Sequence, residues 1–194
     1  MGEKLRIGFG LTGSHCTIPD IWNALQALVD EGADIFPIVS ESVRSTDTRF
    51  GSSESILGRL KTIAGREPWT KQVEVEPIGP KKLLDVMVVA PCTGTTMAKL
   101  ALGISDTVVT LACKAQMRNN RPVVLGISTN DGLGANSINL GYLMTRKNLY
   151  FVPFCQDNPE NKEQSLVSLM DLIPDTISAA LSGKQLQPIL YEPK

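Results

Sequence analysis

The chain has 194 residues, of which 42% are hydrophobic and 20% charged, which favours one sizeable globular domain. Its 19 basic and 20 acidic residues give a formal net charge of −1, which excludes the bulk attraction that drives most nucleic-acid binding. No apolar run approaches the roughly 20 residues of a membrane-spanning helix. No secretory leader follows Met1, so we expect a cytosolic protein.

Apolar runs typical of buried strands alternate with helical patterns along the chain. Strands are expected at residues 5–11, 34–40, 86–90, 123–127 and 149–153. Helices are expected at residues 18–31, 54–64, 96–102, 106–119, 136–146 and 166–181. Thr17 should cap the first helix, Pro91 should end the third strand, and Pro174 should kink or divide the last helix. Residues 44–53 are polar and predict a loop.

This alternation predicts an α/β fold, a single-domain doubly wound parallel sheet of the Rossmann-like kind. We expect the domain to span residues 1–183 and to be followed by an unpatterned tail at 184–194. Ligands of such folds bind beyond the carboxyl ends of the strands. The loops that follow the strands are therefore the places to look for function.

The chain offers little for metal chemistry. Its four cysteines are scattered without CxxC spacing, and His15 is the single histidine. We expect free thiols and no metal site.

The first loop, residues 8–16, reads GFGLTGSHC and contains a GxGxxG pattern. A nicotinamide fingerprint opens its helix at the last glycine and places an acid at the end of the second strand. Here Gly8 and Gly10 fall inside the strand, and Ser40 ends the second strand. The register therefore argues against NAD(P) binding by this chain. Small and hydroxyl residues before a helix still suit a phosphate, with an ordinary strand–helix turn as the alternative.

The second loop is more specific. Residues 88–110 read VVAPCTGTTMAKLALGISDTVVT. This segment resembles the signature A-P-x-[ST]-x-x-T-[LMI]-A-K-[IL]-A-x-G-[IF]-x-D of a flavoprotein family. The family includes phosphopantothenoylcysteine decarboxylase, lantibiotic cysteine decarboxylases and flavin prenyltransferases. The first loop resembles the G-S or G-A-S flavin loop of the same family, and the resemblance covers residues 5–153.

The resemblance implies FMN as the cofactor. The residues implied to hold its phosphate are Gly13, Ser14, His15 and Ser40. The residues implied to lie along its isoalloxazine and ribityl groups are Thr93, Gly94, Thr95 and Thr96. Hydroxyl and backbone N–H groups can satisfy a phosphate dianion without a lysine. Asp106, which closes the signature, is open to a second interpretation as a helix N-terminal acid or structural partner.

The chain departs from the known enzymes of this family. The catalytic histidine of the decarboxylases would fall near Pro77, and their P-x-M-N-x-x-M loop keeps only Asn130. The arginine that prenyltransferases carry after the signature threonine is Leu111 here, and their R-E pair is Ser128-Thr129. An independent decarboxylase or prenyltransferase is therefore the alternative that the sequence disfavours.

The loops GSHC and STNDGLGAN resemble one branch of the family, the second subunit of a bacterial enzyme that makes pyridine-2,6-dicarboxylate for spores. This resemblance implies a first subunit that binds NAD(P). It also implies oxidation of a dihydro- or hydroxytetrahydro-dipicolinate in the mother-cell cytoplasm. Family members commonly form trimer-based homo-oligomers. A non-catalytic binding subunit is the second alternative.

That chemistry needs a proton-transfer group and partners for two carboxylates. His15 is the candidate for proton transfer, with a capping or phosphate-contacting role as the alternative. Asn130 and the backbone N–H groups of residues 132–134 are candidates for one carboxylate. The candidates for the other carboxylate are Arg44, Arg49, Arg118 and Arg146. For each of them the alternative is an ordinary surface charge exposed to solvent. The proposed small fillers beside the flavin are Cys16 and Cys92.

Overall fold

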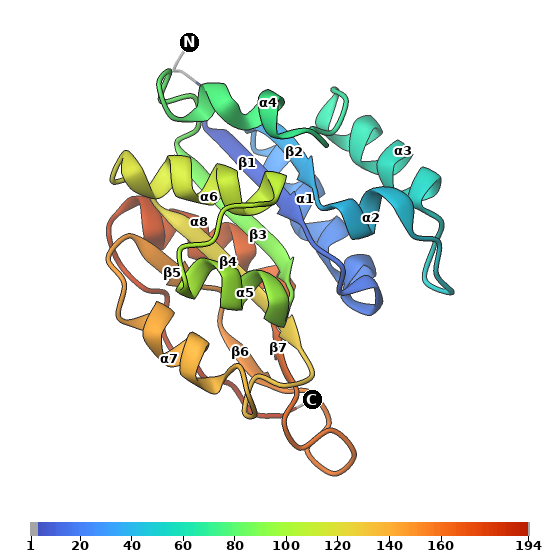
Figure 1. The fold of residues 1–194 in the computed structure, drawn as a ribbon, viewed down its shortest axis with the longest axis vertical. Helices are drawn as coiled ribbons and strands as arrows, with labels where there is room; N and C mark the ends of the chain where they lie inside the picture. Colours follow the sequence, from blue (N-terminus) through green and yellow to red (C-terminus); the bar gives the residue numbers. More distant parts are fainter. Residues whose placement is uncertain (1–3, 194) are drawn as a thin grey trace.

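The structure is a computed structural model that describes residues 4–193. Residues 1–3 and residue 194 lie outside the described residues. The expectation about a secretory leader rests in part on residues 1–3. Seven strands form one sheet between two layers of helices (Figure 1). The strands are β1 Arg6–Leu11, β2 Asp34–Val39, β3 Val86–Cys92, β4 Val123–Thr129, β5 Leu149–Phe151, β6 Phe154–Gln156 and β7 Leu166–Ser168.

The sheet has the order β2-β1-β3-β4-β7-β6, with β5 paired to the first half of β4. The pairs among β1 to β5 are parallel, whereas β7 is antiparallel to both β4 and β6. The chain runs from β1 outward to β2 and returns to β3 on the other side of β1, which makes a topological switch point between β1 and β3. The predicted α/β fold is confirmed, with an antiparallel β6–β7 hairpin added to the parallel sheet.

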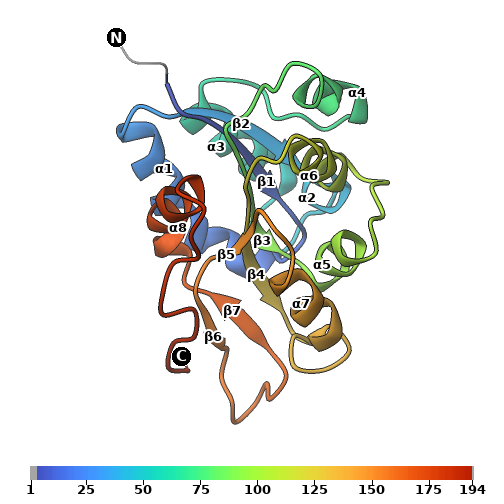
Figure 2. The same cartoon turned by 90° about the vertical axis from the view of Figure 1, so that its left-hand side faces the viewer.

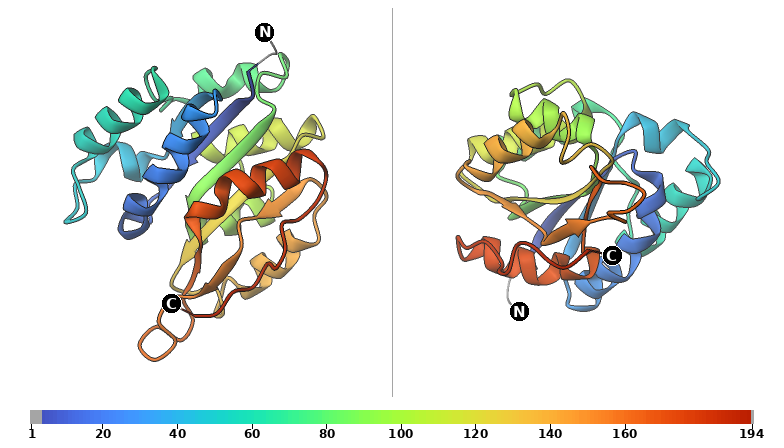
Figure 3. Two further views of the ribbon diagram at one scale, coloured as in Figure 1. Left: turned by 180° about the vertical axis from the view of Figure 1, so that it is seen from behind. Right: turned by 90° about the horizontal axis from the view of Figure 1, so that it is seen from below.

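Two helical layers cover the two faces of the sheet (Figures 2 and 3). The layer on one face consists of α1 Trp22–Asp30, α3 Ser53–Ala64 and α8 Ile173–Leu181. The layer on the other face consists of α4 Gln72–Val75, α5 Gly94–Ala101, α6 Val108–Arg118 and α7 Ser137–Met144. The short remaining elements are η1 His15–Ile21, α2 Glu41–Ser45, η2 Glu76–Ile78 and η3 Met170–Leu172. Of these, α2 extends into the stretch that was predicted to be a loop.

The central strands are buried on both faces, which explains their continuous apolar sequences. In β3, Val86 and Val88 pack toward α1 and α8, whereas Met87 and Val89 pack toward α5 and α6. Gly10 of β1 shows why a larger residue does not fit at its position in the strand. A Cβ on Gly10 would lie 3.2 Å from a methyl carbon of Val109 on α6. Gly10 therefore allows α6 to pack closely on the strand, whereas a Cβ on Gly8 would meet the side chains of Leu84 and Met87, at 2.5 and 2.7 Å.

The strand β3 continues through Pro91 to Cys92, so the prediction that Pro91 ends it is wrong. Proline lacks only the backbone donor and keeps its acceptor. The Pro91 carbonyl accepts hydrogen bonds from the backbone N–H and the hydroxyl of Thr12. On the other side, the pairing with β4 shifts register between Val89 and Cys92, which accommodates the missing donor.

The helix predicted from residue 166 is also wrong in its first part. Leu166–Ser168 forms β7, which pairs with β4 on one side and β6 on the other. The helix α8 begins only at Ile173, and Pro174 lies in its first turn, where a proline costs no intrahelical hydrogen bond.

Residues 184–193 run along the β5–β6 edge without forming a helix. The Gln185 side chain bonds both the backbone N–H and the carbonyl of Phe151, at 2.8 and 2.7 Å. Phe154 donates to the carbonyl of Ile189 and accepts from the backbone N–H of Tyr191, both at 3.0 Å. The segment is thus bonded to the domain through its backbone.

Candidate functional site

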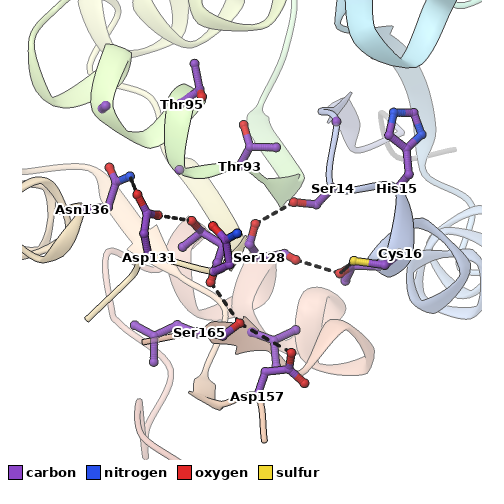
Figure 4. A pocket seen from close by; sticks show the side chains of 18 of the residues that line it. Ser14, His15, Cys16, Thr93, Thr95, Ser128, Asp131, Asn136, Asp157 and Ser165 are labelled. Carbon is purple, nitrogen blue, oxygen red and sulfur yellow. Dashed lines mark hydrogen bonds between the residues drawn. The ribbon is translucent and has the colours of Figure 1, made fainter. Parts of the chain in front are cut away.

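An open cavity of about 1020 Å³ lies at the carboxyl ends of β1, β3 and β4, at the switch point of the sheet. Most of its lining residues come from four segments, residues 13–20, 93–104, 128–136 and 157–167 (Figure 4), and Thr48 and Phe50 complete it. Of the predicted site residues, the structure brings seven to this cavity: Gly13, Ser14, His15, Thr93, Gly94, Thr95 and Asn130.

Thr12 links the first two walls. Its buried hydroxyl donates to the Pro91 carbonyl at 2.7 Å and accepts from the backbone N–H of Thr93 at 3.0 Å. A single side chain therefore satisfies backbone groups on the loop after β3, as buried polar groups require. The loop after β1 and the N-terminus of α5 are held together by these bonds.

Ser14 and Thr17 link the first wall to the end of β4. The Ser14 hydroxyl donates to the Ser128 carbonyl at 2.6 Å, and the Thr17 and Ser128 hydroxyls lie 2.7 Å apart. The prediction that Thr17 caps the first helix is wrong, because its hydroxyl faces β4 instead. The backbone N–H of Ser14 donates to Thr12 at 2.8 Å, so both donors of Ser14 already have protein acceptors.

His15 lies at the edge of the cavity with one ring nitrogen uncommitted. Its Nε2 lies 3.3 Å from the Ser42 hydroxyl of α2. Its Nδ1 is buried and has no partner among the described residues. A Cβ on Gly13 would lie 2.6 Å from the same Ser42 hydroxyl. The loop therefore approaches α2 as closely as a glycine allows, and the buried Nδ1 of His15 is left without a hydrogen bond.

The N-terminus of α5 forms the second wall. Thr93 caps the helix by accepting from the backbone N–H of Thr96 at 3.2 Å, and the two threonine hydroxyls lie 3.0 Å apart. Thr96 does not line the cavity, because it faces Thr93. Ser40 does not line it either, since its hydroxyl caps α2 by accepting from Val43 at 3.4 Å.

Asp131 and Asn136, which the sequence did not single out, organise the loop after β4. The Asp131 carboxylate accepts from the Asn136 amide at 2.7 Å and from the Thr129 hydroxyl. A Cβ on Gly94 would lie 2.6 Å from the Asn136 amide nitrogen. The start of α5 therefore packs directly on this hydrogen-bonded group, and only a glycine fits there.

Two of the backbone N–H groups proposed to bind a carboxylate already have acceptors. Leu133 donates to the Gln164 carbonyl and Gly134 donates to the Asp131 carbonyl, each at 3.0 Å. The prediction that the N–H groups of residues 132–134 bind a carboxylate is wrong for these two. The exposed side chain of Asn130 remains, and it lines the cavity.

None of the four proposed arginines lines the cavity. Arg44 pairs with Glu41 at 2.7 Å on α2, while Arg49 and Arg146 stack on neighbouring aromatic rings. Arg118 lies at the other end of the sheet, beside Gly79. The arginine prediction is therefore wrong, and the lysines that line the cavity are Lys99 and Lys162.

Each of these lysines has an acidic partner. The ammonium of Lys99 lies 2.9 Å from both carboxylate oxygens of Asp106. The hydrogen bond from Lys99 lowers the pKa of Asp106, which gives the signature aspartate a structural partner. The ammonium of Lys162 lies 2.7 Å from one oxygen of Asp157. The cavity thus carries two ion pairs, one on α5 and one on the β6–β7 hairpin.

The two cysteines expected near the ligand differ in their surroundings. Burial raises the pKa of Cys92 to about 12, so this thiol stays neutral and fills space beneath the cavity. Cys16 is exposed and lines the cavity. Within residues 4–193, no group of three or more His, Cys, Asp or Glu side chains is placed to hold a metal ion.

The sequence profile of the flavoprotein family matches residues 1–173, a span that includes every loop of the cavity. The chain belongs to the flavoprotein family. One flavoprotein relative, the second (B) subunit of dipicolinate synthase from Bacillus subtilis (strain 168), is 52% identical over 187 residues, which are 96% of this chain and 94% of that protein. This identity makes the chain a homologue of a synthase subunit.

Two solved flavoprotein structures extend the comparison. The corresponding dipicolinate synthase subunit from Bacillus halodurans C shares the fold with a TM-score of 0.90 and 47% identity, covering 98% of this chain and 97% of that one. DmrB of Burkholderia xenovorans in complex with FMN has a TM-score of 0.67 at 18% identity, covering 94% of this chain and 98% of its own. The second comparison concerns the fold alone.

Proposed function

We propose that this flavoprotein is the FMN-binding subunit of a dipicolinate synthase and acts with a separate, NAD(P)-binding subunit. The observation that carries the proposal is the meeting of the three loops after β1, β3 and β4 in one cavity, in a chain 52% identical to the second subunit of a dipicolinate synthase. Within the described chain no helix is both long and apolar enough to cross a bilayer. We place the pair in the mother-cell cytoplasm of a sporulating bacterium.

The residues of the cavity fit FMN. The unpaired Nδ1 of His15 and the close approach of Gly13 to Ser42 supply a polar cradle for the phosphate. Gly13 and His15 would hold it. Ser14, bonded to Ser128, and Ser40, whose hydroxyl caps α2, would join only by exchanging those bonds. The segment proposed to line the ribityl and ring portions comprises Thr93, Gly94 and Thr95, and Thr96 would join it only by turning its hydroxyl away from Thr93. Bound FMN supplies an acceptor for electrons or a hydride.

The proposed reaction converts dihydrodipicolinate, or the hydroxytetrahydro precursor after loss of water, into pyridine-2,6-dicarboxylate. A hydride leaves the ring for NAD(P)⁺ on the partner subunit and a proton is released. His15 has two alternative roles: it contacts the phosphate, or its Nδ1 accepts that proton while Nε2 stays bonded to Ser42. Asn130 binds one carboxylate of the substrate through its amide.

The subunit also exposes apolar side chains that a homo-oligomer would cover. Leu102, at the end of α5, is 72% exposed and Ile138 on α7 is 75% exposed. Tyr142, one turn further along α7, is 48% exposed. Large apolar groups gathered on neighbouring helices are typical of protein interfaces. We propose that copies of this chain associate there, in the trimer-based manner expected from the sequence.

One assay tests the proposed function. The purified chain, loaded with FMN and followed by its flavin absorbance, is given dihydrodipicolinate and NAD(P)⁺ with and without the NAD(P)-binding subunit. We expect NAD(P)H formation only in the mixture, because the first two glycines of the GxGxxG pattern in this chain lie inside β1. Robust turnover by the isolated chain would overturn the two-subunit proposal. Cysteine decarboxylation or prenyl transfer by the isolated chain would favour the independent flavin enzyme instead.

A further inference from the structure

Two lysines of the described chain line the cavity, and they differ in how exposed they are and in how firmly an acid holds them. Lys99 lies on α5, is 27% exposed, and is held by both oxygens of Asp106. Lys162 lies on the turn of the β6–β7 hairpin and is 55% exposed. Its ammonium contacts only one oxygen of Asp157. Lys162 therefore loses fewer hydrogen bonds than Lys99 does when its side chain turns toward a ligand.

Asp157 keeps a hydrogen-bond donor when Lys162 turns away. The Ser165 hydroxyl lies 3.5 Å from the same carboxylate oxygen, and it also lies 3.2 Å from the Thr129 carbonyl (Figure 4). The hydrogen bond to Asp157 and its charge raise the pKa of Lys162, so the side chain is an ammonium at neutral pH.

Lys162 and Asn130 lie at the same junction. Both line the main cavity, and both line a smaller cavity of about 420 Å³ beside it. A side chain that ends in an ammonium and one that ends in an amide thus line the same space, and each of them can donate to the oxygens of a separate carboxylate.

The neighbouring acids fix the side on which an anion would bind. Glu160 and Glu163 line only the smaller cavity, so their charges disfavour an anion there. In the main cavity, Asp131 is covered by its two hydrogen-bond donors, and Asp20 and Asp157 are the other acids. Of the three acids that line the main cavity in the described chain, Asp131 and Asp157 already accept hydrogen bonds, so an anion meets less uncompensated negative charge on that side of the junction.

We propose that Lys162, beside Asn130, binds the second carboxylate of the substrate and thereby selects dicarboxylates over monocarboxylates. This inference rests on the proposed function, because it takes the substrate class from there. Lys162 is a specificity residue on the hairpin and is separate from the residues proposed to hold FMN.

Calorimetric titration of the full FMN-loaded chain tests the inference, in buffer without divalent metals. The probes are pyridine-2,6-dicarboxylate and pyridine-2-carboxylate, which differ by one carboxylate. We expect Lys162→Met to weaken dicarboxylate binding about tenfold and to change monocarboxylate binding less than about twofold. Lys162→Arg should keep the preference. Lys147→Met, an exposed lysine outside the cavity, controls for the general loss of one positive charge.

The outcomes separate the two proposals. A wild-type chain that binds the dicarboxylate more tightly, with that preference unchanged in Lys162→Met, overturns the role of Lys162 and leaves the proposed function standing. Equal weakening of both ligands by Lys162→Met also overturns it, because a structural role has that signature. A wild-type chain that binds neither compound overturns the substrate class and the inference together.

Discussion

Ser14 and Ser128 are joined by a hydrogen bond of 2.6 Å from the Ser14 hydroxyl to the Ser128 carbonyl. The two residues lie at the ends of β1 and β4, which are separated in the sheet by β3. The bond therefore crosses the end of the intervening strand and fixes the width of the cavity (Figure 4). The walls of the site are therefore held together by hydrogen bonds within the protein.

Substitution of Ser14 should affect stability and FMN binding by different amounts. Ser14→Ala removes one partly buried hydrogen bond and should lower the free energy of unfolding by about 1 kcal/mol. Ser14→Asp places a carboxylate against the Ser128 carbonyl and the expected phosphate, so it should lower stability further and weaken FMN binding more than Ser14→Ala does. Urea denaturation and FMN titration measure the two effects. Ser137→Ala, at an exposed position, is the control. Wild-type FMN affinity in Ser14→Asp would contradict the phosphate assignment.

Two glycine substitutions with the same chemistry should have opposite effects. A Cβ on Gly94 would lie 2.6 Å from both the Asn136 amide nitrogen and the Thr129 hydroxyl oxygen. Gly94→Ala should therefore displace the loop after β4, lower stability and weaken ligand binding. Gly58, in α3, has open space around its Cβ position. Gly58→Ala should raise the free energy of unfolding by about 0.4–1 kcal/mol. Thermal unfolding of the two variants compares them, and equal effects would contradict the packing argument.

Acid should weaken the fold in part through Asp85, at the end of the sheet opposite the cavity. Burial alone would raise the pKa of Asp85, but hydrogen bonds from Arg6 and the charges of Arg6 and Arg121 outweigh burial and lower it. A carboxyl whose folded pKa lies below its unfolded value of 3.8 stabilises the fold above that value. The stabilisation is lost as the pH falls through the folded pKa.

Asp85→Asn should therefore be less stable than the wild type at neutral pH. The difference in free energy of unfolding should shrink as the pH falls below the unfolded value of 3.8. Denaturant unfolding at a series of pH values measures this difference. Asp175→Asn, an exposed substitution on α8, should show a smaller and flatter difference. A constant difference for Asp85→Asn across the acid range would show that the ion pair does not carry the effect.

The central sheet could be predicted from the sequence because its strands are buried on both faces. The apolar runs of β1 to β4 are recognisable without any tertiary information. β7 is not recognisable in this way, because Leu166–Ser168 has three residues and its strand form comes from pairing with β4 and β6. The spacing of Leu166, Leu169 and Met170 matched a helix, and tertiary pairing overrode it.

Part of the cavity could be predicted because two of its loops follow strands that are recognisable in the sequence. Its loops follow β1 and β3, where the signature segment and the first loop identify Ser14 and Thr93. Lys162 was missed because it lies on a hairpin whose position depends on β7. Asp131 was missed because its role depends on Asn136, five residues later, and on the close approach of α5. Such contacts depend on the tertiary fold and are not visible in a local pattern.

Thiol labelling should distinguish Cys16 from the other cysteines. Cys16 is exposed in the cavity, whereas Cys92, Cys113 and Cys155 are buried. Burial raises the pKa of Cys113 as well as that of Cys92, which leaves both as unreactive thiols. Iodoacetamide should therefore add one label per folded chain at neutral pH. Mass spectrometry should find that label on Cys16, and Cys16→Ser should abolish it.

Bound FMN should slow this labelling, since Cys16 lines the cavity beside His15. Denatured protein, in which all four cysteines should react, is the control. Rapid labelling of Cys92 in the folded chain would contradict its burial. Labelling of Cys16 at the same rate with and without FMN would place the flavin away from the first loop.

His15 and Asn130 should affect the proposed oxidation in different kinetic parameters. His15→Asn removes the group proposed to accept the proton, so kcat in the mixture with the NAD(P)-binding subunit should fall about a hundredfold. The shorter amide removes the ring that carries the unpaired Nδ1. Asn130→Ala removes a contact made equally in the bound substrate and the transition state, so KM should rise about tenfold with kcat nearly unchanged.

The control for both variants is complex formation with the NAD(P)-binding subunit, measured by size-exclusion chromatography, together with FMN content. Complex formation should match the wild type in both variants. FMN content should match it in Asn130→Ala, and in His15→Asn it reports whether His15 also contacts the phosphate. An unchanged kcat in His15→Asn would assign His15 to the phosphate alone. A fall in kcat without a rise in KM for Asn130→Ala would mean that Asn130 acts in the transition state and is not a ground-state carboxylate contact.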